Sequence, residues 1–280
     1  MFQNIARLFI NSLLLGLMGL PAATLVIQGQ TLPAGNQDAV QRLEDSTRRR
    51  EMVRIKTESG DTLTALVVYP KGSGPAPVVV AIHGRGGWNS WVQALADQLA
   101  ADGFLAIAPD MGSGQGPGGS GTKSLEADAA AKLVYSLTQE QVMERVSAVA
   151  DYAMALPEAR PRFAVVGFCW GGTTSFAYAG QRPDLGAAVV YYGSSPSAQV
   201  LARINAPVLG LYGGDDARVN VSIEPADVEM KRLGKSYQYE IYPDAGHAFL
   251  AGQGRSEANS AATARAWPRT LQFLNKHVRQ

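Results

Sequence analysis

The sequence Gly-Phe-Cys-Trp-Gly-Gly at residues 167–172 constrains the fold of this 280-residue chain more than any other segment. An apolar run at 163–166 precedes it and indicates a strand, and a helix-compatible segment follows it. In a sharp strand-to-helix turn the positions two residues from the centre must be small, which explains Gly167 and Gly171 around Cys169. Such a turn exposes the central side chain above the sheet and frees the N–H of Trp170. The segment predicts a nucleophile at Cys169, and the alternative is a buried structural cysteine.

Strand-like and helix-like segments alternate along the rest of the chain. Apolar or alternating runs predict strands at 52–56, 63–69, 78–82, 104–108, 163–166, 187–192, 207–212 and 237–242, the first two forming a hairpin. Helical patterns occur at 91–101, 125–137, 140–156, 171–181, 225–233 and 257–277, the last interrupted near Pro268. This order predicts an α/β fold with a mostly parallel central sheet of about eight strands and helices on both faces. Functional residues are then expected at the carboxyl ends of the strands.

Composition excludes several classes of function. The net charge is +1 and 18% of residues are charged, so the chain has no electrostatic footprint for nucleic acid. The short run Arg48-Arg49-Arg50 is interpreted as a solvated surface patch. A single cysteine excludes an intramolecular disulfide, and one cysteine with three histidines argues against a structural zinc site. We therefore expect neither a metal nor another cofactor.

The first thirty-odd residues differ from the remainder. Arg7 precedes an apolar run at 8–20, and small residues follow it at 21–23, which is the layout of a secretory signal peptide. We expect a leader at 1–23, a linker or N-terminal arm at 24–50 and a folded domain at 51–280. The protein is then secreted or periplasmic, with no stable membrane association once the leader is removed. An uncleaved N-terminal anchor is the alternative.

Residues 112–121 are dense in glycine and invite comparison with a phosphate-binding loop. No Gly-Lys-Ser/Thr step follows and no helix opens directly from the segment, so a mobile surface loop without core residues is the better interpretation. Asp110, just before it, is expected to shape the loop rather than to titrate in a site.

Three residues at expected strand ends form a catalytic pattern, namely Cys169, Asp216 and His247. A cysteine nucleophile needs a base or a cation to hold it as thiolate, and the histidine in turn needs a carboxylate to orient it. His247 follows a strand, whereas His277 falls in the terminal helix. Asp216 caps an apolar strand and Asp215 is its competitor, interpreted as a turn residue.

The sequence His-Gly-Arg-Gly-Gly at 83–87 follows the third strand. Glycines allow the backbone to approach a substrate closely, and the N–H of Arg85 is expected to join that of Trp170 as an oxyanion donor. His83 and Gly84 are assigned supporting roles, with the imidazole of His83 bonding to loop backbone and ordering this turn.

From about residue 51 to the end, the chain resembles the dienelactone hydrolase family of α/β-hydrolases. The matching segments are 167–172 at the elbow, 212–216 (Tyr-Gly-Gly-Asp-Asp), 245–249 (Ala-Gly-His-Ala-Phe), 108–110 (Ala-Pro-Asp) and 191–193 (Tyr-Tyr-Gly). The resemblance implies an α/β-hydrolase fold and an enzyme that hydrolyses a small-molecule carboxylic ester or lactone. It also implies a thioester on Cys169, with Asp216 and His247 as partners. A thioesterase or peptidase on the same residues, or a non-catalytic binding protein with this fold, are the alternatives.

Two departures from the family pattern argue against dienelactone itself as the substrate. Family members acting on it place a glutamate where this chain has Gly84, and an arginine shortly after the histidine, where the nearest here is Arg255. Without a carboxylate at 84, the thiol is expected to give its proton directly to His247. Asp110 and Glu51 are the candidates for a carboxylate that could replace the glutamate.

Overall fold

The computed structural model describes residues 31–72 and 74–279. The predicted leader at 1–23, and the first part of the predicted arm at 24–30, lie outside the described residues. Within the described residues a single sheet contains the strands β1 (Arg50–Lys56), β2 (Thr62–Val68), β3 (Ala76–Ile82), β4 (Leu105–Pro109), β5 (Ala159–Phe168), β6 (Ala187–Tyr191), β7 (Val208–Asp215) and β8 (Tyr237–Gly246).

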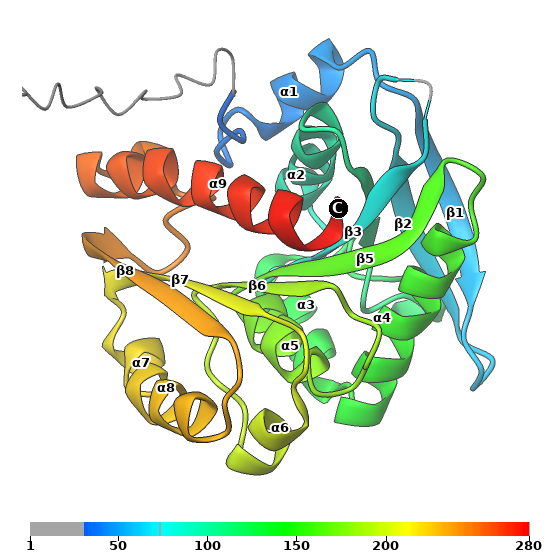
Figure 1. The fold of residues 1–280 in the computed structure, drawn as a ribbon. Helices are drawn as coiled ribbons and strands as arrows, with labels where there is room; N and C mark the ends of the chain where they lie inside the picture. The colour runs from blue at the N-terminus through cyan, green and yellow to red at the C-terminus, as the bar shows by residue number, and fades with distance from the viewer. Residues whose placement is uncertain (1–30, 73, 280) are drawn as a thin grey trace, which may run out of the picture. The chain divides into compact units, whose positions relative to one another are not determined.

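The strands lie in the order β1-β2-β4-β3-β5-β6-β7-β8 (Figure 1). β2 runs antiparallel to β1 and β4, and every neighbouring pair from β4 to β8 is parallel. Every residue of β3, β4 and β6 is buried, which is why these strands read as continuous apolar runs. The predicted mostly parallel α/β sheet of about eight strands is confirmed.

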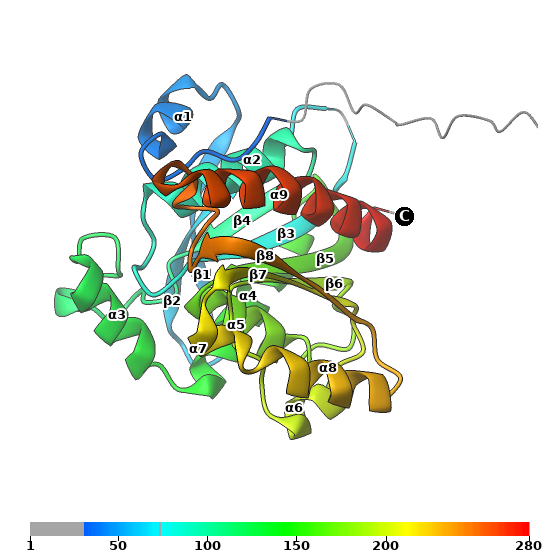
Figure 2. The ribbon, with the colours of Figure 1, turned by 90° about the vertical axis from the view of Figure 1, so that its left-hand side faces the viewer.

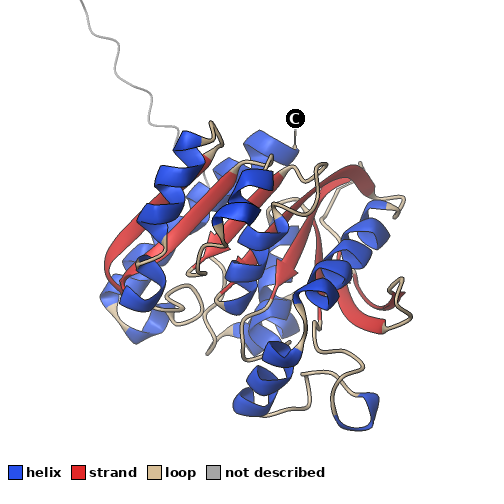
Figure 3. Ribbon diagram, turned by 90° about the horizontal axis from the view of Figure 1, so that it is seen from below, coloured by secondary structure: helices blue, strands red, loops and turns tan. Residues whose placement is uncertain are grey.

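Helices cover both faces of this sheet. In the described residues they are α1 (Ala39–Asp45), α2 (Ser90–Ala101), α3 (Ala127–Ser136), α4 (Gln139–Met154), α5 (Trp170–Tyr178), α6 (Ala198–Arg203), α7 (Ala217–Asn220), α8 (Ile223–Arg232) and α9 (Glu257–Val278), with short 3-10 turns η1 (Pro117–Gly119) and η2 (Gln253–Arg255). α1, α2 and α9 share one core with the sheet, whereas α4, α5, α6 and α8 share the other (Figures 1 and 2). Figure 3 shows the second face from below, with its helices in front of the strands.

The predicted interruption of the last helix near Pro268 is wrong, because α9 continues through this residue. Proline has no N–H to donate to the carbonyl four residues earlier, which belongs to Ala264. Ala264 is exposed, so its carbonyl can bond to water, while Trp267 and Leu271 on either side of Pro268 are buried and hold the helix in place.

Residues 31–49 of the predicted arm attach to the domain through Ala39 and Leu43, which pack into the core, and through polar contacts. α1 packs beside α2, and the arginines Arg42 and Arg48 both pair with the fully buried carboxylate of Asp97 in α2. Arg48 is therefore not simply part of a solvated patch. The side chain of Gln98 also donates to the carbonyl of Thr31 at 2.9 Å. These polar contacts use charges and backbone carbonyls, and so leave no hydrophobic pattern in the sequence.

The glycine-rich segment is exposed in its middle but anchored at its ends. Gly112 and Ser113 are buried, which corrects the expectation that this loop has no core residues. The carboxylate of Asp110 accepts hydrogen bonds from the N–H groups of Gly112 and Thr122 and from the Thr122 hydroxyl. Asp110 thus shapes its loop as expected. None of the helices among the described residues is both long and apolar enough to span a membrane.

Candidate active site

Cys169 occupies a strained turn between β5 and α5. Its backbone has φ 57° and ψ −113°, in the left-handed region that residues with a side chain rarely adopt. A Cβ on Gly167 would overlap the carbonyl of Gly171, and one on Gly171 would overlap the carbonyl of Ile82 in the neighbouring strand β3. The two glycines of the motif are therefore required by close backbone approach, as the sequence predicts.

The sheet order explains why the loop after β3 meets this turn. The chain adds β4 on one side of β3 and then returns to place β5 on the other side, so the loops after β3 and β5 diverge at this point. In open parallel sheets such a switch point leaves a crevice at the carboxyl ends of the strands. Gly84 lies against the nucleophile here, since a Cβ on it would be 3.4 Å from the Cβ of Cys169.

The structure brings Cys169, His247 and Asp216 into one line of contacts. The Nε2 atom of His247 lies 3.0 Å from the Sγ atom of Cys169, and its Nδ1 atom lies 2.5 Å from a carboxylate oxygen of Asp216. β7 and β8 are adjacent parallel strands, so their ends deliver the aspartate and the histidine side by side. Asp216 is only 7% exposed, whereas Asp215 is exposed.

Both predicted oxyanion donors face the sulfur. Hydrogen bonding from the backbone N–H groups of Arg85 and Trp170 helps to lower the pKa of the Cys169 thiol. The N–H of Trp170 is also at the amino terminus of α5, where the helix dipole adds partial positive charge. Two donors that converge on one point can stabilise either a thiolate or the oxyanion of a tetrahedral intermediate.

The electrostatic environment favours charge separation between Cys169 and His247. Burial raises the pKa of the Cys169 thiol, but the hydrogen bond from His247 and those from the two backbone N–H groups outweigh it, so this pKa lies below its ordinary value. Burial lowers the pKa of His247, but its contacts with Cys169 and Asp216 outweigh burial and place this pKa above its ordinary value. Both shifts favour a thiolate–imidazolium pair.

The two carboxylates considered as replacements for the family glutamate lie in other networks. Asp110 bonds to the loop that follows it, and Glu51 in β1 accepts hydrogen bonds from Arg49 and Tyr69. Among residues 31–72 and 74–279, neither has a hydrogen bond to Cys169 or His247. Arg255 lies in η2 with its side chain against Gly252.

Two residues that sequence reasoning missed hold His247 in place. The side chain of Asn259 in α9 accepts from the N–H of Gly246 at 2.9 Å and donates to the carbonyl of Gly252 at 3.0 Å, bracing the loop that carries the histidine. The ring of Tyr192 packs edge-on to that of His247, with centroids 5.2 Å apart. Tyr192 also has a positive φ of 42°. The Tyr-Tyr-Gly sequence at 191–193 is one of the segments that match the family, whereas no local sequence pattern marks Asn259.

Both ring nitrogens of His83 bond to backbone groups. Its Nδ1 atom lies 2.7 Å from the carbonyl oxygen of Gly84, and its Nε2 atom accepts from the N–H of Met111 at 3.1 Å. This arrangement agrees with a supporting role. Among the described residues, no group of three or more histidine, cysteine, aspartate or glutamate side chains is arranged to hold a metal ion.

Comparison with known proteins identifies the family. The profile of the dienelactone hydrolase family matches residues 63–278. The chain belongs to the dienelactone hydrolase family. The Escherichia coli (strain K12) protein named "Putative carboxymethylenebutenolidase" is 32% identical over 233 residues, which cover 78% of this chain and 84% of that protein.

Solved structures support the same assignment. The dienelactone hydrolase-like promiscuous phosphotriesterase P91 from metagenomic libraries superposes with a TM-score of 0.70 at 25% identity, covering 83% of this chain and all of that one. An acylaminoacyl peptidase from Pyrococcus horikoshii has a TM-score of 0.66 at 14% identity over 86% of this chain and 44% of its own, which shows the shared fold only. The protein is therefore a hydrolase with the α/β-hydrolase fold, as the sequence predicts.

Proposed function

We propose that this dienelactone hydrolase family member hydrolyses small carboxylic esters or lactones through a thioester on Cys169. The observation that carries the proposal is the line of contacts from Asp216 through His247 to the Sγ atom, and the backbone N–H groups of Arg85 and Trp170 support it because they lower the pKa of the thiol. A thiolate held in this way is a nucleophile that already has its proton acceptor and its oxyanion donors in place.

The reaction follows from this geometry in two halves. The thiolate attacks the carbonyl carbon, and the electron pair displaced onto the oxygen is stabilised by the N–H groups of Arg85 and Trp170. Collapse of this intermediate breaks the ester bond, and the departing alkoxide takes the proton from Nε2 of His247. Water then attacks the thioester while His247 accepts its proton, and the second intermediate expels the thiolate and releases the acid. Asp216 keeps Nδ1 protonated throughout.

Direct detection of the acyl-enzyme tests this mechanism. After brief mixing with an activated aryl ester and acid quench, mass spectrometry is expected to show one acyl group on the peptide that contains Cys169. His247→Gln should slow this acylation strongly, whereas His277→Gln, in the terminal helix, should leave it unchanged. Acylation of another residue would rule out the thioester on Cys169. The absence of any acyl group on an enzyme that is hydrolysing the ester would also rule it out. A panel of aryl esters, lactones, thioesters and peptides would separate this function from thioesterase and peptidase activity.

The resting state of the thiol gives a second prediction. Because the thiol pKa is lowered and the His247 pKa is raised, the ion pair is expected to form as pH rises through the thiol pKa and to lose its imidazolium proton above the histidine pKa. Activity should rise and fall across the same window. Titration of the ultraviolet absorbance of thiolate in the free enzyme, with Cys169→Ser as the blank, measures this. A thiol that stays protonated above neutral pH until substrate is added would contradict the resting pair.

A further inference from the structure

The peptide unit between Gly84 and Arg85 carries one of the two N–H groups that face Cys169. Its carbonyl oxygen accepts two hydrogen bonds, from Nδ1 of His83 at 2.7 Å and from the N–H of Gly87 at 3.1 Å. In a planar trans peptide the C=O and N–H point in opposite directions. The described residues contain no cis peptide. Holding the carbonyl on one side of the loop therefore aims the Arg85 N–H at the sulfur on the other side.

Both ring nitrogens of His83 are committed to backbone groups. Because Nε2 accepts a hydrogen bond from the Met111 N–H, the ring must be neutral and carry its proton on Nδ1, where it can donate to the Gly84 carbonyl. The side chain is 1% exposed, and burial keeps the pKa of His83 below its ordinary value despite its contact with Gly84. The ring also stacks on that of Trp170, which carries the second N–H donor, with centroids 5.8 Å apart.

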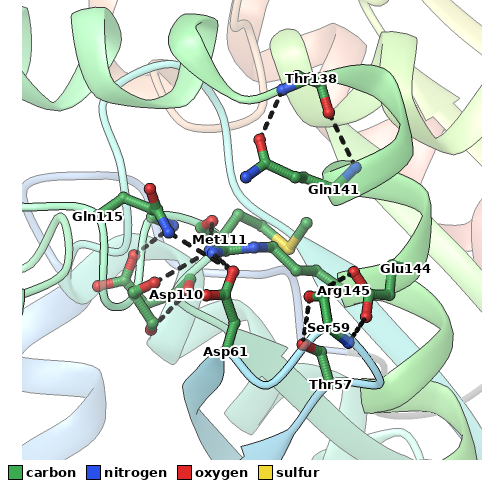
Figure 4. A network of polar contacts seen from close by, with 12 residues as sticks. Thr57, Ser59, Asp61, Asp110, Met111, Gln115, Thr138, Gln141, Glu144 and Arg145 are labelled. Carbon is green, nitrogen blue, oxygen red and sulfur yellow. Dashed lines mark hydrogen bonds and ion pairs between the residues drawn. The ribbon is translucent and has the colours of Figure 1, made fainter.

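Met111 is held in turn by a buried arginine on α4. One terminal nitrogen of the fully buried Arg145 donates to the carbonyl of Met111 at 2.7 Å and to that of Ser113 at 3.0 Å. Its other terminal nitrogen pairs with the carboxylate of Asp61, in the turn between β1 and β2. Figure 4 shows Arg145 reaching from its helix to Met111 and Asp61. A buried guanidinium is costly unless it is paired and hydrogen-bonded. Both terminal nitrogens of Arg145 have partners, whereas its Nε has none among the described residues, so the two terminal nitrogens are what tie the loop to α4.

We propose that Arg145, Met111 and His83 form a positioning chain that holds the Gly84–Arg85 peptide with its N–H directed at the nucleophile. The proposal rests on the proposed function, because it assigns a catalytic use to that N–H. Neither His83 nor Arg145 contacts the reacting atoms, so both are positioning residues. Without the His83 bond, the peptide can rotate and present the Gly84 carbonyl toward Cys169, where it would repel a thiolate or an oxyanion.

A pair of variants at His83 separates positioning from stability. The side-chain amide of asparagine occupies roughly the place of Nδ1 and that of glutamine the place of Nε2. His83→Asn should therefore keep the donor to Gly84 and lose the acceptor for Met111, and His83→Gln should do the reverse. His83→Gln should lose more turnover, with up to roughly a 10²-fold fall in kcat, the scale of removing one oxyanion donor.

The stability of the same two variants should rank in the opposite order. His83→Asn leaves the buried N–H of Met111 unpaired, whereas in His83→Gln the Gly84 carbonyl still accepts from Gly87. Thermal unfolding should therefore show His83→Asn as the less stable protein although it is the more active one. If the activity of the two variants follows their stability instead, the positioning chain is wrong.

Titration of the Cys169 thiol supplies a readout that does not need turnover. Loss of the Arg85 N–H should reduce ionisation of the thiol by roughly tenfold at a given pH, since a hydrogen bond to a charged group has that weight. The reduction should appear in His83→Gln and in Arg145→Lys, which cannot reach both carbonyls and Asp61. Tyr178→Phe is the control. It removes the hydrogen bond between Tyr178 and Ser147, which lies on α4 as Arg145 does, but it leaves the contacts of Arg145 with Met111 and Ser113 intact. An unchanged thiol pKa in His83→Gln would overturn the inference.

This readout separates the inference from the function on which it rests. If Cys169→Ala retained turnover, the proposed function would fail, yet the titration would still report whether His83 aims the Arg85 N–H at the sulfur. If Cys169→Ala is inactive and the thiol ionises equally in all His83 variants, the proposed function stands and the positioning chain does not.

Discussion

Cys169→Ala is expected to reduce ester hydrolysis by about 10⁶-fold in kcat, the scale of removing a nucleophile from a hydrolase with a histidine base. The backbone strain at this position is unchanged, because alanine and cysteine share the Cβ atom that the positive φ disfavours. The variant should therefore fold, and the loss should be chemical. Steady-state turnover of an activated aryl ester, alongside thermal unfolding, measures both quantities.

Cys169→Ser is the matched comparison for this loss. The hydroxyl keeps the position of the nucleophile and both backbone N–H donors, but His247 must remove its proton during attack rather than beforehand. A residual esterase activity above that of the alanine variant is expected. An alanine variant that hydrolyses the ester at the wild-type rate would show that the reaction takes place at another site in the chain.

The strands of this fold can be predicted from sequence periodicity because each has a regular pattern of burial along its length. β3 and β6 are buried on both faces, so their residues form unbroken apolar runs, whereas the partly exposed strand β1 alternates. Whether α9 can continue through Pro268 depends instead on the surroundings of the carbonyl that loses its N–H donor because proline has none. That carbonyl belongs to exposed Ala264, a fact of the tertiary structure that the sequence near Pro268 does not contain.

The residues of the candidate site also fall into two groups, those that local sequence motifs predict and those that only the three-dimensional structure reveals. Cys169 and His247 lie in motifs whose chemistry is local, namely a strained turn and a histidine directly after a strand. Arg145 and Asn259 act on backbone groups that lie 34 and 13 residues away in sequence, at Met111 and Gly246. An arginine or asparagine on an amphipathic helix gives no sign of such a partner, because the partner is a backbone group that every residue possesses. These roles become visible only when the loops are placed in space.

Asp216→Asn is expected to cut turnover on the order of 10⁴-fold, the scale of the same substitution in a serine triad. The Asp216 carboxylate accepts a hydrogen bond from the N–H at Nδ1 of His247, with the two heavy atoms 2.5 Å apart. An asparagine can instead present its N–H₂ group there, which would favour the tautomer with the proton on Nε2 and leave that nitrogen unable to accept the thiol proton. The His247 pKa should also fall, since one of the contacts that raises it is lost, and the thiolate should become scarcer in the free enzyme.

The neighbouring carboxylate provides the control for this substitution. Asp215 is exposed and ends β7, and it precedes the bend that turns Asp216 toward the histidine. Asp215→Asn removes the same charge one residue away, so a general electrostatic effect would lower turnover in both variants by similar factors. A specific orienting role predicts a large loss for Asp216→Asn with near-normal unfolding, and less than about a twofold change for Asp215→Asn, because interactions between exposed charges are weak. If the two losses are reversed, Asp215 is the acid and the contact between Asp216 and His247 is structural.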